Sequence, residues 1–286
     1  LLLRVSDNEI WLRGGRCWLR AMLSQWSGEE RLHANVLTPV LISGKQGLSK
    51  STFCRLLMPD SLRHYFIDNL NLTAGSSPEK KLVKNGLINL DEFDKIKESQ
   101  QATLKNLLQM VNVPVFRGKR LGWVNESRLA SFIATTNVYQ VLIDSTGSRR
   151  FLCVEVLKPI SEEPLEHKQI YAQLKEELKS GAPDYLNKEE EKALQKHNKA
   201  YYRQSLLEDV FHCCFRHPLE TEKGIWLTTA EIFQVMRKFN STALKEVSAR
   251  QLGLKLSAMG YMAKHTSFGN RYYVFNLSAE KKDVSL

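Results

Sequence analysis

The segment LISGKQGLSKST, residues 41–52, constrains the fold more than any other part of the sequence. A short apolar run at 40–42 precedes Gly44, and Lys50-Ser51-Thr52 follow at the spacing of a phosphate-binding loop. Such a loop needs a strand before it and a helix after it, because backbone amides and the positive end of the helix dipole together hold the phosphates. We therefore predict a strand over 40–42 and a helix over 50–57.

In such a loop, Lys50 reaches the β- and γ-phosphates of ATP and Ser51 binds Mg²⁺. Ser49 stands where the usual pattern has its second glycine. A serine fits there if its φ is negative, whereas a positive φ costs about 1–2 kcal/mol of strain. For the loop alone, a Gly/Ser-rich turn before a helix is the alternative. The candidate nucleotide-binding residues are Gly44, Gly47, Ser49, Lys50, Ser51 and Thr52.

Two further strand ends are predicted to lie beside this loop. LINLDE, residues 87–92, is an apolar strand that ends in Asp91 and Glu92. A P-loop ATPase uses the first acid of such a pair for Mg²⁺ and the second to polarise the attacking water. RLASFIATTN ends in Asn137, which would bind the γ-phosphate or the water in the crevice at the carboxyl end of the sheet. Alone, each pattern is also typical of a strand that runs into a turn.

DSTGSRRFLCVEV, residues 144–156, places Arg149 and Arg150 between a Gly-Ser turn and a strand. An arginine presented from such a loop can stabilise transition-state charge at the γ-phosphate of a neighbouring subunit. The alternative for one of the two is an ion pair with a nearby carboxylate such as Glu155.

The ordered set GKQGLSKST, LINLDEFD, FIATTN and DSTGSRRF resembles the virulence-associated protein E (VirE) family of P-loop ATPases, relatives of superfamily 3 helicases and of phage or plasmid primase-helicases. The resemblance covers about residues 30–205. It implies Walker B roles for Asp91 and Glu92, a sensor role for Asn137, and an arginine finger in trans at Arg149 or Arg150. It also implies a homo-oligomeric ring, expected to be a hexamer, and a primase-like domain upstream.

Between the acid pair and the sensor strand, VPVFRGKRLGWVNESRLASF predicts a hairpin around Gly118 in which apolar and basic residues alternate. In superfamily 3 relatives a hairpin at this place enters the central pore and contacts single-stranded DNA. Lysine and arginine there would contact phosphates, and Trp123 could stack on a base. A solvated surface hairpin is the alternative. The candidate nucleic-acid-binding residues are Arg117, Lys119, Arg120 and Arg128.

The last 80 residues predict helices, then two β-rich runs joined by a turn at Gly269-Asn270, which is the order of a winged helix. Capping boxes at Thr228/Glu231 and Ser248/Gln251 open two of the helices. Arg250, Lys255 and Arg271 are the candidates for duplex DNA contacts. Winged helices also bind proteins, so a solvated face is the alternative. In HCCFRH, residues 212–217, core packing of the cysteines is favoured over a zinc site.

Charge and composition limit the possible partners and location. The formal charge of +10 favours a polyanion partner. Five scattered cysteines fit a reducing cytoplasm, and the sequence contains no readable membrane span or signal peptide. The chain begins with Leu1 rather than Met, so we expect a piece of a longer protein.

The sequence therefore predicts an α/β P-loop NTPase core, AAA+ or superfamily 3 helicase-like, with a C-terminal winged helix. The expected segments are an N-terminal helical segment at 1–30, the ATPase core at 31–180, a helical linker at 181–205 and the winged helix at 206–286. The expected function is an ATP- and Mg²⁺-dependent, DNA-stimulated replicative helicase or translocase of a mobile element or phage-like genome. The alternatives are a nucleotide-gated DNA-binding or loading protein with slow hydrolysis, which Ser49 favours, and a small-molecule kinase.

Overall fold

The computed structural model describes residues 3–28, 31–73, 77–143, 148–203, 206–219, 221–245, 247–267 and 269–277. The chain divides into two compact units, Leu1–Tyr202 and Arg203–Leu286. Within the described residues, none of the helices combines the length and the apolarity that crossing a bilayer requires.

A parallel sheet forms the centre of the first unit. In the described part of the chain it has five strands in the order β2-β3-β6-β1-β7. The hydrophobic runs of four of the strands are buried on both faces, as expected of a parallel sheet covered by helices on each side, whereas the edge strand β2 is half-buried to exposed. The strands are β1 (Thr38–Ile42), β2 (Phe66–Asp68), β3 (Leu87–Leu90), β6 (Ser131–Thr136) and β7 (Phe151–Glu155).

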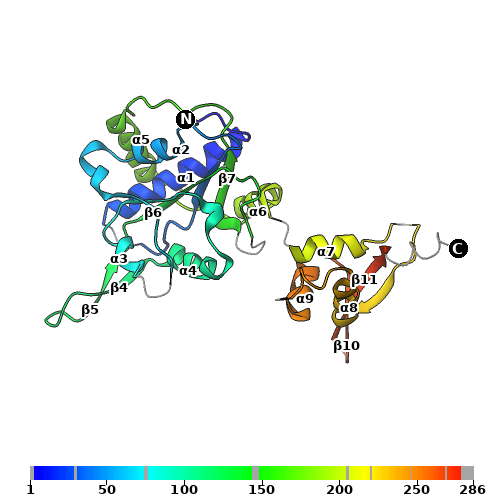
Figure 1. Ribbon diagram of the computed structural model, residues 1–286. Coiled ribbons are helices and arrows are strands. Elements are labelled where there is room, and N and C mark those ends of the chain that lie inside the picture. Colours follow the sequence, from blue (N-terminus) through cyan, green and yellow to red (C-terminus); the bar gives the residue numbers. More distant parts are fainter. Residues whose placement is uncertain are drawn as a thin grey trace. The chain divides into compact units, whose positions relative to one another are not determined.

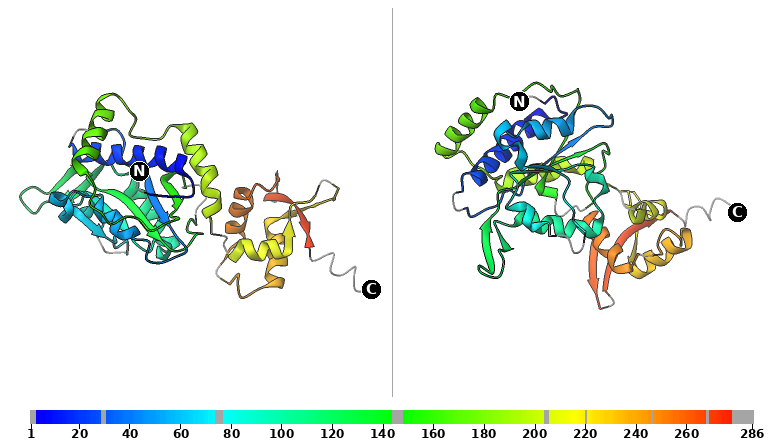
Figure 2. Two further views of the ribbon diagram at one scale, coloured as in Figure 1. Left: turned by 90° about the horizontal axis from the view of Figure 1, so that it is seen from above. Right: turned by 60° about the vertical axis from the view of Figure 1, so that its left-hand side comes forward.

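Helices cover both faces of this sheet, as Figures 1 and 2 show. One face packs against α1, α2 and α5 through a core that includes Trp18, Leu41 and Ile133. The opposite face packs against α3 and α4 through a core that includes Leu104 and Phe132. The helices are α1 (Asn8–Trp26), α2 (Lys50–Leu56), α3 (Glu79–Leu82), α4 (Glu98–Gln109), α5 (His167–Lys179) and α6 (Lys188–His197).

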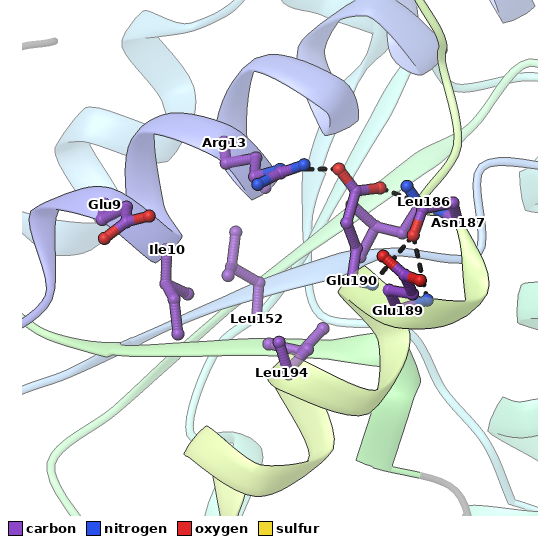
Figure 3. A pocket seen from close by; sticks show the side chains of 11 residues that line it. Glu9, Ile10, Arg13, Leu152, Leu186, Asn187, Glu189, Glu190 and Leu194 are labelled. Carbon is purple, nitrogen blue, oxygen red and sulfur yellow. Dashed lines mark hydrogen bonds and ion pairs between the residues drawn. The ribbon is translucent and has the colours of Figure 1, made fainter.

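Helix α6 belongs to this first unit, although 181–205 was predicted to be a linker. Figure 3 shows the contact: Arg13 of α1 donates a 2.6 Å hydrogen bond to Glu190 of α6 above a small pocket of about 250 Å³. Ile10, Leu152 and Leu194 line the pocket. The apolar side chains of α6 therefore complete the core beside α1 and β7.

A two-stranded antiparallel hairpin, β4 (Asn112–Phe116) and β5 (Trp123–Ser127), projects from the first unit (Figure 1). Val113 and Val115 point inward and are buried, whereas Phe116 and Trp123 form the last pair before the tip and are exposed. Gly118 and Gly122 both have positive φ, which lets the tip turn tightly.

The second unit has its own hydrophobic core. Phe211, Ile232, Met236 and Leu256 are fully buried in it, Cys214 is buried, and Cys213 is exposed. Both predicted capping boxes are confirmed at the starts of α8 and α9. The helices are α7 (Leu206–Cys214), α8 (Thr229–Phe239) and α9 (Ala249–Ala258); the antiparallel strands are β8 (Phe215–Arg216), β9 (Ile225–Thr228), β10 (Ala263–Thr266) and β11 (Gly269–Asn276).

Candidate active site

The carboxyl ends of β1, β3 and β6 meet at one edge of the sheet because these strands are neighbours and parallel. The residues that follow them enclose a cavity of about 380 Å³. The loop between β1 and α2 forms one wall, and the ends of β3 and β6 form the other. The lining residues are Gln46, Gly47, Leu48, Ser49, Lys50, Ser51, Thr52, Asp91, Glu92, Asp94, Thr135, Thr136, Asn137 and Val138.

Lys50, the first residue of α2, joins the two walls of the cavity. Its ammonium donates hydrogen bonds to Ser43 Oγ at 2.5 Å and to Asn137 Oδ1 at 2.8 Å. Only 8% of Lys50 is exposed, and this burial lowers the pKa of the side chain while the nearby Asp91 carboxylate raises it. The predicted phosphate-binding lysine and the predicted sensor asparagine therefore lie together.

Ser51 and Asp91 also lie together. Ser51 Oγ donates to Asp91 Oδ1 at 3.3 Å, and Thr135 Oγ1 donates to the same carboxylate oxygen. A hydroxyl and a carboxylate at adjacent positions suit a hard cation such as Mg²⁺. Within the described residues, no three His, Cys, Asp or Glu side chains converge on one point, so an ion here would draw its remaining ligands from phosphates and water.

Glu92 has a different environment from Asp91. Its φ is +51°, in the left-handed region, where a non-glycine residue costs about 1–3 kcal/mol and often marks a functional turn. The carboxylate accepts a 2.6 Å hydrogen bond from Lys95, and both side chains are more than half exposed. This bond is the main reason that the pKa of Lys95 is raised.

Sequence reasoning assigned no role to Asp94 or Thr136, which also line the cavity. Thr136 Oγ1 donates to Asp94 Oδ1 at 2.6 Å and accepts the backbone N–H of Val138 at 3.0 Å. The third acid in DEFD and the paired hydroxyls in TTN were the sequence signals that could have indicated this contact.

The loop itself adopts strained backbone at Ser49, whose φ is +59°. Ser49 therefore occupies the left-handed conformation that glycine takes at lower cost, and Gly47 has a φ of +79°. Gly44 has a steric reason to be glycine, because an added Cβ would lie 2.9 Å from Cε2 of Tyr139. Ser49 Oγ donates a 2.6 Å hydrogen bond to Glu162 Oε1.

Arg149 and Arg150 lie in a 3-10 turn, Ser148–Arg150, just before β7. Arg149 is exposed and forms a 3.0 Å ion pair with Glu191 of α6, so its carboxylate partner is not Glu155. Glu155 instead accepts a hydrogen bond from Tyr139. Residues 144–147, the first part of the DSTGSRRF motif, lie outside the described residues.

The basic residues of the hairpin divide into two groups. Lys119 and Arg120 are exposed at the tip beside Leu121, whereas Arg117 forms a two-point ion pair with Glu126 across the strands. That ion pair partly neutralises the Arg117 charge. Lys119 and Arg120 are therefore better placed than Arg117 to attract an anion.

Arg128 was predicted to bind nucleic acid, and its burial contradicts this. Only 2% of it is exposed, because its guanidinium lies under the base of the hairpin and donates to backbone carbonyls. Burial lowers its pKa to about 9, so the group keeps its charge at neutral pH. The carbonyls at the end of α4 compensate this charge, as a helix C-terminus does for a cation. The acceptors are the carbonyl oxygens of Asn35, Leu107, Leu108, Met110 and Ala130.

The candidate residues of the second unit lie in three environments. Arg250 is exposed and lines a groove of about 620 Å³ between α8, α9 and the start of β11. Lys255, on α9, forms a 3.0 Å ion pair with Glu208 of α7. Arg271 pairs in register with Lys264 and Thr228 and is half-buried on the sheet. Arg250 is therefore the most exposed of the three side chains.

A strand, a loop that begins a helix with Lys50-Ser51, and acids after a neighbouring parallel strand define a domain of the P-loop NTPase class. Sequence comparison makes the assignment more specific. The chain belongs to the virulence-associated protein E-like domain family, which matches residues 4–203. The resemblance identified in the sequence motifs is thus confirmed.

A second family, described as a domain of unknown function from a B. Theta gene (DUF3874), matches residues 204–274. No curated protein matches the chain in a sequence comparison.

Solved structures of the NrS-1 C-terminal region are similar to this chain. One, an A form apo structure, has 17% identity and a TM-score of 0.40 over 70% of this chain and 48% of that one. A second apo structure has 12% identity and a TM-score of 0.43 over 94% of this chain and 72% of that one. The chain therefore spans about half the length of the first of these relatives.

Proposed function

We propose that the chain is a Mg²⁺-dependent ATPase that acts on DNA as a helicase or translocase of a mobile element or phage-like genome. One observation carries the proposal: Lys50, buried at the start of α2, contacts Asn137 at the end of β6. A lysine that joins a phosphate loop to a neighbouring strand end would contact the terminal phosphates of a nucleotide in this cavity.

ATP would bind with its phosphates along residues 44–52. Mg²⁺ would be held by Ser51 and Asp91, and it would neutralise charge that develops on the phosphates. A carboxylate of the 91–94 turn would orient the attacking water. Glu92 is the residue that the acid pair predicts, and this role would require its carboxylate to leave Lys95.

Arg149 or Arg150 would complete the site of a neighbouring subunit. Arg149 is exposed on the 3-10 turn, and moving it to a partner's γ-phosphate would break only a surface ion pair with Glu191. Such pairs contribute at most about 1 kcal/mol, so the exchange is energetically accessible. This role requires an oligomer, and we propose a hexameric ring.

Single-stranded DNA would contact the hairpin tip. Lys119 and Arg120 supply two exposed cations, and Trp123, 72% exposed, offers a ring on which a base can stack. Stacking and phosphate contacts of this kind are independent of sequence, as a motor that moves along DNA requires.

The second unit would act as a winged helix. Its order α7-β8-β9-α8-α9-β10-β11, with β11 between β9 and β10, supports this proposal. Arg250 on α9 and the start of β11 border the same groove, which would receive duplex DNA.

A nucleotide-gated loader with slow hydrolysis is the second candidate. It is favoured by Ser49, which holds a left-handed conformation and contacts Glu162 rather than leaving the loop free for phosphate. Unwinding of a forked duplex with ATP would support the motor, whereas nucleotide-dependent DNA binding without unwinding would support the loader.

The first experiment is ATP hydrolysis with Mg²⁺, with and without single-stranded DNA, comparing the chain with Lys50→Ala and Ser51→Ala. The proposal expects DNA-stimulated hydrolysis that Lys50→Ala abolishes and that Ser51→Ala weakens most at low Mg²⁺. A chain that binds no ATP, or whose hydrolysis is unaffected by Lys50→Ala, would refute it.

A further inference from the structure

Three carboxylates, Asp91, Glu92 and Asp94, line the nucleotide cavity, and their partners differ. Asp91 and Asp94 each accept a hydrogen bond from a threonine at the end of β6. Glu92 is held by Lys95 on the surface. The sheet therefore fixes the positions of two of the acids, and the third pairs with an exposed lysine side chain.

The two threonines point to opposite faces of the sheet, because consecutive strand residues alternate. Ile133 packs in the core beside α1 and α2, and Ala134 packs in the core beside α4. Thr135 therefore faces the α2 side, where it shares Asp91 with Ser51. Thr136 faces the α4 side, and Asp94 lies with it.

This separation distinguishes the roles that the two aspartates can take. In phosphoryl transfer the attacking and leaving oxygens are roughly in line through phosphorus. The phosphate loop would hold the leaving β-phosphate on the α2 side, so water must approach the γ-phosphate from the other side. Asp94 lies on that side of the strand end.

The direction of the Thr136 hydroxyl strengthens this inference. Its oxygen accepts the N–H of Val138, so its hydrogen is left to donate to Asp94. Thr136 is only 3% exposed, which restricts its rotation. Asp94 is thus held by a fixed donor at one oxygen, and its other oxygen remains able to accept a proton from water.

We propose that Asp94, positioned by Thr136, orients the attacking water of the ATPase. The water oxygen forms the new bond to the γ-phosphorus as the bond to the β–γ bridging oxygen breaks. ADP leaves with that electron pair, and the carboxylate of Asp94 takes the water proton. The inference rests on the proposed ATPase function and specifies its general base.

The test compares the full chain with Asp94→Asn and the matched variant Glu92→Gln. Each substitution removes a carboxylate of the same turn with little change in shape. ATP binding and single-turnover hydrolysis are measured with Mg²⁺ and saturating single-stranded DNA. We expect Asp94→Asn to lower the hydrolysis rate about 10²–10⁴-fold with ATP affinity within about threefold, as loss of a general base does. The fold-loss in hydrolysis rate caused by Glu92→Gln should be at least tenfold smaller.

Thr136 provides a second, independent test. Thr136→Val should lower the hydrolysis rate while leaving KM for ATP unchanged, and Thr136→Ser should restore the rate because it keeps the hydroxyl. A valine variant with full activity would overturn the positioning role. Melting temperatures identify any variant that has failed to fold. If Asp94→Asn is such a variant, the comparison of Thr136→Val with Thr136→Ser tests the proposed role of Asp94 in its place.

Failure of this inference differs from failure of the ATPase proposal. If Lys50-dependent hydrolysis is present but Asp94→Asn loses no more than Glu92→Gln, Asp94 is not the base and the ATPase stands. If the chain binds ATP through Lys50 and does not hydrolyse it, the inference fails and the loader remains. If no ATP binds, the proposed function itself fails.

Discussion

Ser49 in the phosphate loop donates a 2.6 Å hydrogen bond to Glu162, 113 residues later in the chain. The backbone supports the same contact, because the N–H of Ile160 donates to the carbonyl of Leu48 at 3.2 Å. The segment after β7 is therefore attached to the loop at two adjacent points. It brings a carboxylate beside the place where phosphates would bind.

The first prediction follows from the charge of Glu162. Glu162→Gln should tighten ATP binding several-fold, because it removes a negative charge next to the triphosphate while keeping a hydrogen-bond acceptor for Ser49. Glu162 is exposed, so added salt should reduce the difference between the two proteins. Titration with a fluorescent ATP analogue at two salt concentrations measures both effects. The control is Glu163→Gln on the neighbouring acid; equal effects from both would point to a general change in charge.

The second prediction concerns the arginine finger. Arg149→Ala retains the phosphate loop but lacks the arginine, and Lys50→Ala retains Arg149 but lacks the lysine of the loop. Each variant alone should therefore be inactive. If Arg149 acts in trans, a mixture should regain hydrolysis at interfaces that pair an intact loop with an intact arginine. Activity of mixtures at several ratios measures this recovery. No recovery at any ratio would place the function of Arg149 within its own subunit, and Arg150→Ala in the same series tests the neighbouring arginine.

The third prediction uses the salt dependence of DNA binding at the hairpin tip. Replacing both Lys119 and Arg120 by alanine should weaken binding of single-stranded DNA and lower the slope of log affinity against log salt by about 1.4, or about 0.7 for each lost phosphate contact. Fluorescence anisotropy of a labelled oligonucleotide measures the slope. Arg117→Ala is the matched control, because Glu126 already pairs with that arginine. The same slope in the double variant would exclude phosphate contacts by the tip.

The fourth prediction concerns stability. Arg128→Met should lower the free energy of unfolding by about 3–5 kcal/mol, because it removes the guanidinium that donates to the buried carbonyls of Asn35 and Leu108. At about 2–4 °C for each kcal/mol, the first unit should melt roughly 6–20 °C lower. Calorimetry measures the shift. Arg120→Met is the surface control and should melt within about 2 °C of the unchanged chain. A similarly small shift for Arg128→Met would contradict the structural role.

The fifth prediction is a pH dependence in the second unit. Arg216 bonds to Glu222 and holds the pKa of that carboxyl at about 2, below its ordinary 4.5. A depressed folded-state pKa stabilises the fold above the unfolded pKa, and this contribution is lost as pH falls from about 4.5 to about 2. Melting temperature across this range should fall less steeply for Glu222→Gln than for the unchanged chain. Parallel curves would show that the pair contributes no measurable stability.

The strands and the loop of the first unit could be predicted because their signals are local. Apolar runs and the spacing of Gly44 and Lys50 specify strand, loop and helix within 15 or so residues. Parallel order then brings Asp91 and Asn137 to the same edge without further information.

The contacts that could not be predicted depend on packing between distant segments. Arg128 follows a basic hairpin in sequence and resembles its neighbours, yet the carbonyls at the end of α4 enclose it. Arg149 pairs with Glu191 because α6 folds back onto the first unit, which no local pattern indicates. The Thr136–Asp94 bond likewise depends on the exact alignment of β3 and β6.

The chain passes from one hydrophobic core to the other between Tyr202 and Arg203, and the two family matches meet at residues 203 and 204. Each core is closed by its own residues, so a substitution that alters one need not disturb packing in the other. Recombination at this point would exchange whole folded parts without cutting through a core. Selection could therefore replace the C-terminal unit while the P-loop domain is inherited unchanged.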